Sequence, residues 1–180
     1  MNKLISIRVC LAIAVVSMSG AQADPAARLK SAEIVDVPAK YADWQYKIGN
    51  LQVRFTDGHV EVLTKDAHCL QPIISPTGAL GWIHFSHMGG RDGDALLDEE
   101  LRIRLPDGKF TGFEPEPNGD TLFIEKWGFT DGGASVVMKT RSWHGPAAIH
   151  KIDIKTGKIT GRASTAGDDL PKWAKAYSDD

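Results

Sequence analysis

Cysteine is scarce in this sequence of 180 residues, which contains only Cys10 and Cys69. Cys10 lies in an N-terminal leader that we expect to be removed, so Cys69 would stand alone in the mature protein. An intramolecular disulfide is therefore excluded. A lone cysteine is most often a small buried hydrophobic residue. His68 precedes it, but neighbouring residues of a strand point to opposite faces, so His68 is badly placed to activate the thiol.

Long hydrophobic runs are also missing. Residues 9–16 form an uninterrupted apolar stretch, whereas a membrane-spanning helix needs about 20 apolar residues. Lys3 and Arg8 supply positive charge before the stretch, and Ala21 and Ala23 form a small-x-small cleavage site after it. This pattern is typical of a secretory signal peptide.

The leader predicts the organisation of the whole chain. We expect residues 1–23 to be a signal peptide that is cleaved after Ala23. Residues 24–180 would then form a single β-rich domain, which is an ordinary domain size. The mature protein would be periplasmic or secreted, with no membrane anchor.

Clusters of basic residues are absent as well. The sequence has 21 Lys and Arg against 23 Asp and Glu, and its formal net charge is −2. Nucleic acids and anionic membranes are bound by clustered Lys and Arg, so nucleic acid is not an expected partner. A mildly acidic chain is better suited to a protein partner.

Recognised catalytic and cofactor motifs do not occur. There is no GxSxG elbow, phosphate-binding loop or dinucleotide fingerprint, so we expect no cofactor. His84 and His87 are three residues apart, which places them on opposite faces of a continuous strand. No HxxxH, HExxH or CxxC spacing is present. The sequence therefore predicts no catalytic and no metal-ligating residues.

Short alternating segments separated by glycine-containing turns dominate what is present. Apolar and polar residues alternate over residues 51–55, 101–105 and 149–154, as they do in half-buried strands. Asp57-Gly58 and Asp107-Gly108 have the composition of tight hairpin turns, because glycine readily adopts positive φ. We therefore predict an all-β protein of about ten strands. Its antiparallel meanders would form a partial β-propeller or a small β-sandwich.

Two segments have helical potential. One is a short piece at residues 26–30. The other covers residues 168–177, where Asp168 can cap a helix and Pro171 falls in its first turn. A short C-terminal helix is therefore expected beside the strands.

Two stretches resemble a known family. Residues 74–78 (ISPTG) lead into the apolar run of residues 79–85, which predicts a strand buried on both faces. This turn resembles the SPDG turn of WD40-like β-propeller blades of the TolB type, with Thr77 in place of the usual Asp. Residues 127–158 resemble one whole blade, because they end in a segment (IDIKTGK) similar to the YD-x-TGK ending of such blades. The resemblance covers about half of the mature chain and implies propeller-like sheets.

A fainter resemblance is to small periplasmic immunity proteins that protect against type VI secretion peptidoglycan amidases. Those proteins are also single β-rich domains with a blade-like hairpin. The resemblance implies an inhibitor that sterically blocks a cell-wall-degrading enzyme, and it transfers no individual residue.

Residues 89–100 (GGRDGDALLDEE) form the first candidate contact segment. Its carboxylates belong to Asp92, Asp94, Asp98, Glu99 and Glu100. A long acidic loop on a compact domain is suited to protein contact, so Asp92, Asp94 and Asp98 are predicted to bind a partner. Calcium is an alternative ligand of such oxygen clusters, although the glycine of the EF-hand loop is missing.

Residues 143–146 (WHGP) form the second candidate contact segment. Tryptophan is enriched among interface hot spots, and Trp143 with His144 is an unusual choice for a hairpin tip. We predict that Trp143, His144 and Gly145 bind the partner. The four remaining tryptophans are expected in the core or over the ends of sheets, and a sugar-binding face lined by all five tryptophans is the alternative.

These features predict an exported, non-catalytic binding protein, with an inhibitor of a cell-wall-degrading enzyme as its concrete form. Residues 89–100 or 143–146 would fill the active cleft of the partner. One alternative is a small periplasmic hydrolase or metal-dependent enzyme that uses His84, His87 and carboxylates. Another is a structural or assembly factor of the cell envelope.

Overall fold

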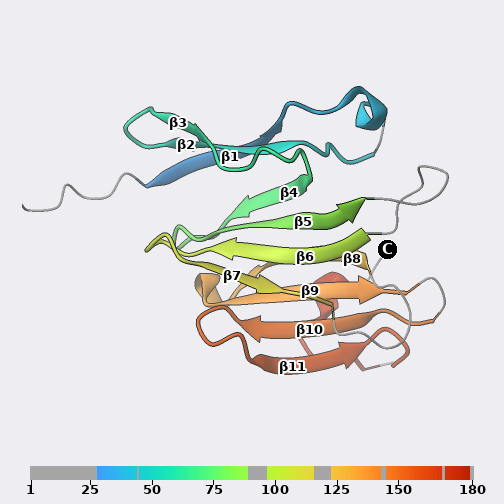
Figure 1. Ribbon diagram of the computed structural model, residues 1–180. Coiled ribbons are helices and arrows are strands. Elements are labelled where there is room, and N and C mark those ends of the chain that lie inside the picture. The colour runs from blue at the N-terminus through green and yellow to red at the C-terminus, as the bar shows by residue number, and fades with distance from the viewer. Residues whose placement is uncertain are drawn as a thin grey trace, which may run out of the picture.

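The computed structural model describes residues 28–43, 45–88, 97–115, 123–142, 145–167 and 169–178. Eleven strands run through this part of the chain (Figure 1). The strands are β1 (Leu29–Val35), β2 (Asn50–Phe55), β3 (Val60–Val62), β4 (Cys69–Ile74), β5 (Leu80–Met88), β6 (Leu97–Arg104), β7 (Phe110–Phe113), β8 (Phe123–Thr130), β9 (Ser135–Arg141), β10 (Ala148–Asp153) and β11 (Ile159–Ser164).

The strands form three antiparallel sheets that lie one above another (Figure 1). The N-terminal sheet has the order β1-β2-β3 and the central sheet the order β4-β5-β6-β7. The C-terminal sheet has the order β11-β10-β9-β8. Each sheet is a meander of neighbouring strands, so the predicted all-β class and antiparallel meanders are confirmed.

The hairpin turns form where glycine follows aspartate in the sequence. Gly58 and Gly108 have φ of 94° and 85°, a conformation that residues with a Cβ rarely adopt. Asp57 Oδ1 accepts a hydrogen bond from the backbone N–H of His59 at 3.1 Å. Asp107 Oδ1 accepts the equivalent bond from Lys109 at 3.0 Å. Local turn chemistry therefore fixes both hairpins, as the sequence predicts.

The central sheet is buried on both faces. Along β5, Leu80 and Trp82 face the N-terminal sheet, where Leu51 and Val53 complete an apolar layer. Alternate residues of β5 face the C-terminal sheet. That second layer contains Ile83, Phe85, Leu101, Ile103, Trp127, Val136 and Met138. The strand predicted over residues 79–85 is therefore confirmed as buried on both faces.

The C-terminal segment covers the outer face of the C-terminal sheet without forming the expected α-helix. Residues 169–178 contain turns and one 3-10 turn, Lys175–Tyr177. A helix of about ten residues is marginal on its own, and in this segment Trp173 and Ala174 pack against Val137 and Ile149. The other two 3-10 turns are Ala39–Tyr41 and Asp131–Gly133.

The N-terminal helical expectation is also wrong where it can be compared. Leu29 and Lys30, which belong to the segment expected to be helical, lie in β1. Residues 1–27 are outside the described part of the chain, so the signal peptide and its cleavage stay predictions. In the ranges that are described, no helix has the length and apolar character needed to cross a membrane.

Candidate functional site

The two ends of the sheet stack carry different kinds of connection (Figure 1). At one end, which we call the turn end, tight turns join the strands at residues 56–59, 75–79, 105–109, 131–134 and 154–158. At the opposite end, the connection end, longer segments join them at residues 36–49, 63–68, 89–96, 114–122 and 142–147. Binding residues concentrate on longer loops held by a rigid scaffold. The connection end is therefore the candidate functional end.

Both predicted contact segments are attached to the connection end. Met88 pairs with Leu97 where β5 and β6 end, and Thr140 pairs with Ala148 beside the β9–β10 connection. The strands therefore deliver residues 89–96 and 142–147 to the same end of the molecule. The sequence did not show this, because the two segments are far apart along the chain.

The predicted contact residues themselves are only partly described. Asp92, Asp94, Trp143 and His144 lie outside the described residues. Asp98 belongs to β6, where the backbone alone is described at this position. Gly145 is exposed and has φ of 112°, a conformation that favours glycine and accounts for its place in the turn.

A partly buried polar cluster lies near the connection end, between the N-terminal and central sheets. Cys69 begins β4 and pairs directly with His84 of β5. Cys69 Sγ is 3.6 Å from His84 Nδ1, and His84 Nε2 is 3.3 Å from Asp66 Oδ2. Asp66 comes from the connection between β3 and β4. The pairing of β4 with β5 therefore places a thiol, an imidazole and a carboxylate in one row.

A β-bulge in β4 creates this pairing. Ile74 pairs with Leu80 and Ile73 with Gly81, but Leu70 pairs with Ile83 after a register shift. Gln71, inside the shift, has φ of 49°, and Pro72 beside it has no N–H to offer the ladder. Without the bulge, Cys69 would face Phe85 and His84 would face Leu70. The extra residue therefore brings the thiol and the imidazole together.

The chemistry of Cys69 follows from its burial. Its side chain is fully buried, and this desolvation raises the pKa of the thiol to about 11, against a smaller lowering by the nearby Thr64 hydroxyl. Burial also lowers the pKa of His84, as does the positive charge of Arg102. The thiol therefore stays protonated at neutral pH and out of reach of a substrate. The predicted small buried cysteine is confirmed.

Glu99 is a second buried polar residue, and sequence reasoning placed it wrongly. The sequence predicts that Glu99 belongs to an acidic loop at residues 89–100, but Glu99 lies in β6 and is 9% exposed. Its Oε2 accepts a hydrogen bond from the backbone N–H of Ile124. Burial nevertheless raises the pKa of Glu99 to about 7. The alternation of Leu101 and Ile103, continued back by two residues, would have found it.

A third polar group lies on the outer face of the C-terminal sheet. Lys139 Nζ is 3.2 Å from Glu125 Oε2, and Arg141 Nε is 3.1 Å from the same oxygen. Lys139 is 1% exposed. A buried ammonium needs such a partner, so Glu125 has a structural role here.

The other residues singled out in the sequence are His87 and the tryptophans. β5 continues through His87 to Met88, with a register shift after Phe85, and the side chain of His87 is not described. Trp82 and Trp127 are buried, as expected for core tryptophans. Trp173 is half-buried against the C-terminal sheet. The tryptophans that are described therefore do not form an exposed sugar-binding face.

Comparison of the chain with family models, curated proteins and solved structures found no match.

Proposed function

We propose that the mature protein is an exported, non-catalytic binding protein whose connection end contacts a protein partner. The observation that carries the proposal is the placement of the strand ends. The β5–β6 and β9–β10 connections start from the same end of the sheet stack. Asp92, Asp94 and Asp98 could therefore act on one partner together with Trp143 and His144.

The sheets beneath these connections supply a rigid support. Leu101 of β6 and Met138 of β9 are both buried in the layer between the central and C-terminal sheets. The strands that hold the two contact segments are thus packed against the same core. A rigid support reduces the conformational entropy lost on binding.

The concrete form of the proposal is steric inhibition of a cell-wall-degrading enzyme. It rests on the resemblance to periplasmic immunity proteins. In this mechanism the carboxylates of residues 89–100 would face a cationic rim on the partner, because charge complementarity fixes orientation and speeds association. Trp143 would fill a pocket in the partner's cleft.

The hydrolase alternative has weaker support. A carboxyl with a pKa near 7 suits a general acid, and Glu99 has such a pKa. Glu99 is, however, buried beside Ile124 in the sheet interface. Cys69 is fully buried. Neither group is placed to meet a substrate in the described part of the chain.

A charge-neutralising variant tests which end binds. The partner would first be isolated by affinity capture from a periplasmic fraction and identified by mass spectrometry, and its affinity would then be measured. The test variant combines D92N, D94N and D98N. The control, which removes equal charge from the N-terminal sheet and the turn end, combines D57N, E61Q and D107N.

We expect the test variant to bind at least about 10-fold more weakly, as for the loss of one hot-spot contact, and the control to bind as the unmodified protein does. Equal weakening in both variants would contradict the placement of the interface. To test steric inhibition, the hydrolysis of peptidoglycan by the purified partner would be measured with and without the protein. Undiminished hydrolysis by the saturated complex would rule out steric inhibition.

A further inference from the structure

The cluster of Asp66, Cys69 and His84 brings together three side chains that bind metal ions. A carboxylate oxygen, the cysteine sulfur and a histidine nitrogen all lie within 4.8 Å of one another. Sulfur and imidazole ligands favour zinc and related ions over calcium or magnesium. No short metal-ligand motif marks this group in the sequence, because the β4 bulge assembles it.

The separation of the thiol and the imidazole fits one shared ion. Zinc binds cysteine sulfur at about 2.3 Å and histidine nitrogen at about 2.0–2.1 Å, with tetrahedral angles. Those values place the two ligand atoms about 3.6 Å apart. Cys69 Sγ is 3.6 Å from His84 Nδ1. An ion could therefore bind both atoms without a change in the spacing of the two strands.

The surroundings of the sulfur suit a thiolate. Among the described residues, the indole N–H of Trp82 is buried and has no hydrogen-bond partner. Trp82 slightly lowers the pKa of the Cys69 thiol, against the dominant raising by burial, and Thr64 Oγ1 lies 3.4 Å from the Cys69 sulfur. A metal-bound thiolate would accept hydrogen bonds from both groups. A neutral thiol is a weak acceptor and leaves the indole N–H poorly satisfied.

Asp66 supplies the adjustable side of the site. Its side chain is 43% exposed, whereas that of His84 is 6% exposed. Asp66 lies beside Nε2 of His84, whereas Cys69 lies beside Nδ1 of the same ring. An ion bound to Cys69 and to His84 Nδ1 therefore requires the Asp66 side chain to shift towards Nδ1. Its position on the connection before β4 allows this. The exposed side of the cluster also gives an ion a path inward.

We infer that Asp66, Cys69 and His84 bind one zinc-type divalent cation, with water completing the tetrahedral coordination. The ion would fix the connection between β3 and β4, through Asp66, to strands β4 and β5 of the central sheet. This site is separate from the partner-binding segments, so it stands or falls independently of the proposed function.

Cobalt is the probe, because thiolate coordination to Co²⁺ produces a near-ultraviolet charge-transfer absorption. The untagged mature protein would be reduced, freed of metal and titrated with Co²⁺. We expect one equivalent to bind with the thiolate absorption and to be displaced by Zn²⁺. C69S should abolish that absorption.

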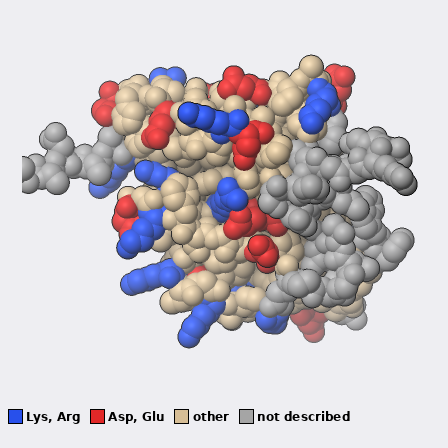
Figure 2. Space-filling view, in the orientation of Figure 1, with Lys and Arg blue, Asp and Glu red and all other residues tan. Residues whose placement is uncertain are grey.

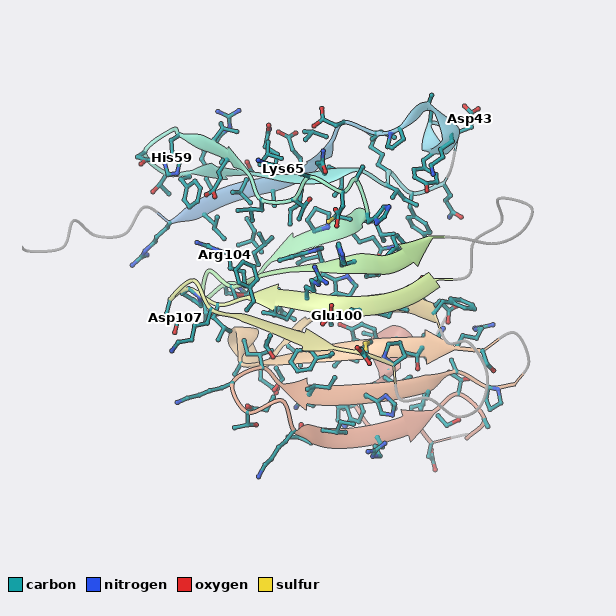
Figure 3. All side chains as sticks on the ribbon, in the orientation of Figure 1. Asp43, His59, Lys65, Glu100, Arg104 and Asp107 are labelled. Atoms are coloured by element: carbon teal, nitrogen blue, oxygen red, sulfur yellow. The ribbon has the colours of Figure 1, made fainter. Side chains whose placement is uncertain are left out.

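Two further variants guard against a folding defect in C69S. D66N changes an exposed side chain and should weaken binding about 10-fold or more, as loss of a ligand or its orienting partner does. The control is D57N, which alters another aspartate–histidine pair, since Asp57 Oδ1 is 2.7 Å from His59 Nδ1. Figure 3 shows His59 at the turn end, whereas Cys69 begins β4 beside the connection end.

D57N should bind Co²⁺ as the unmodified protein does. Two results would overturn the inference. One is a folded protein that takes up Co²⁺ without the thiolate absorption, or takes up none. The other is equal weakening by D66N and D57N. Either would leave Cys69 and His84 as a hydrogen-bonded pair of the core.

Discussion

Glu99 shows how strongly a single residue can couple this fold to pH. Its carboxyl is buried in the layer between the central and C-terminal sheets and accepts a hydrogen bond from Ile124. Burial raises its pKa to about 7 from an ordinary value of 4.5. The folded protein therefore keeps a proton on Glu99 at pH values where the unfolded chain has lost it.

The sign of the pH effect follows directly. Because the folded state binds the extra proton, the contribution of Glu99 to stability is full below about pH 4.5 and is lost as the pH rises through about 7. E99Q keeps an acceptor for the Ile124 N–H but cannot ionise. We expect E99Q to be more stable than the unmodified protein at pH 8, by on the order of 1–3 kcal/mol, and closer to it at pH 5.

Urea unfolding of both proteins at pH 5 and pH 8 would measure the difference. Identical pH dependence in the two proteins would show that Glu99 is ionised or solvated in the folded state.

At the scale of the elements, strain concentrates beside the Cys69–His84 pair. Ala67 and Gln71 flank it with φ of 56° and 49°. A non-glycine residue in this left-handed region costs about 1–2 kcal/mol. The backbone N–H of Ala67 donates to Asn50 Oδ1 at 2.8 Å, which helps to hold this conformation.

Glycine should relieve that strain. We expect A67G to raise the free energy of unfolding by about 1 kcal/mol. The control is A42G, because Ala42 is exposed and has an ordinary φ of −59°, so glycine there should lower stability by about 0.5–1 kcal/mol. Thermal unfolding of both variants decides the point. Destabilisation of both by the same amount would argue against the left-handed backbone at Ala67.

The elements that sequence could predict are those with local causes. Asp57-Gly58 and Asp107-Gly108 specify their turns through positive φ and a side-chain hydrogen bond two residues on. The bulge at Gln71 has no comparable local signal, although Pro72 gives a hint. The segment at residues 168–177 was predicted as a helix from its capping and proline pattern. Its burial against Val137 and Ile149 depends on a sheet formed earlier in the chain.

For the candidate site, the sequence predicts the contact segments but not their arrangement in space. The segments 89–100 and 143–146 stand out by composition, but the strand order that brings their ends together is a property of the whole fold. The sequence suggests His87 and unspecified carboxylates as companions of His84. Its actual partners, Cys69 and Asp66, depend on strand register.

The connection between β9 and β10 carries the prediction for the proposed interface. Trp143 should be an anchor there, so W143A should weaken partner binding by roughly 2 kcal/mol or more. Stability should change little if the indole is free to contact a partner. Binding and thermal unfolding would be measured on the same samples. A large loss of stability would instead identify Trp143 as a packing residue.

At the scale of the whole molecule, close packing between the central and C-terminal sheets holds the stack together. Gly81 of β5 lies where a Cβ would come within 2.5 Å of the Trp127 ring and 2.7 Å of Ile103 Cδ1. No side chain fits between these sheets at that point. The interface therefore depends on glycine for its spacing.

An added methyl group tests this spacing. We expect G81A to destabilise the protein by about 1–3 kcal/mol, because the buried Trp127 ring must move. The control is G112A, whose Cβ would meet the side chain of Glu100, and Figure 3 shows Glu100 on the central sheet. That flexible carboxylate can move aside, so the change should be about 0.5 kcal/mol or less. Equal effects in urea unfolding would contradict the tight sheet contact.

The charges of the turn end bear on the proposed placement of the interface. The turn end shows projecting Lys and Arg side chains in Figure 2, and its exposed lysines include Lys109, Lys155 and Lys158. The connection end receives the acidic and tryptophan-containing segments. Asp57 and Asp107 are exposed at the same end, so the turn end carries charges of both signs, and the acidic segment 89–100 is what would draw a partner with a cationic cleft to the connection end.

Hydrogen–deuterium exchange of the protein with and without its captured partner tests this central claim most directly. The backbone amides of residues 89–100 and 142–147 should become protected together in the complex, while the turns at residues 56–59 and 105–109 exchange as in the free protein. Protection of the turn end with unchanged exchange at the connection end would contradict the account.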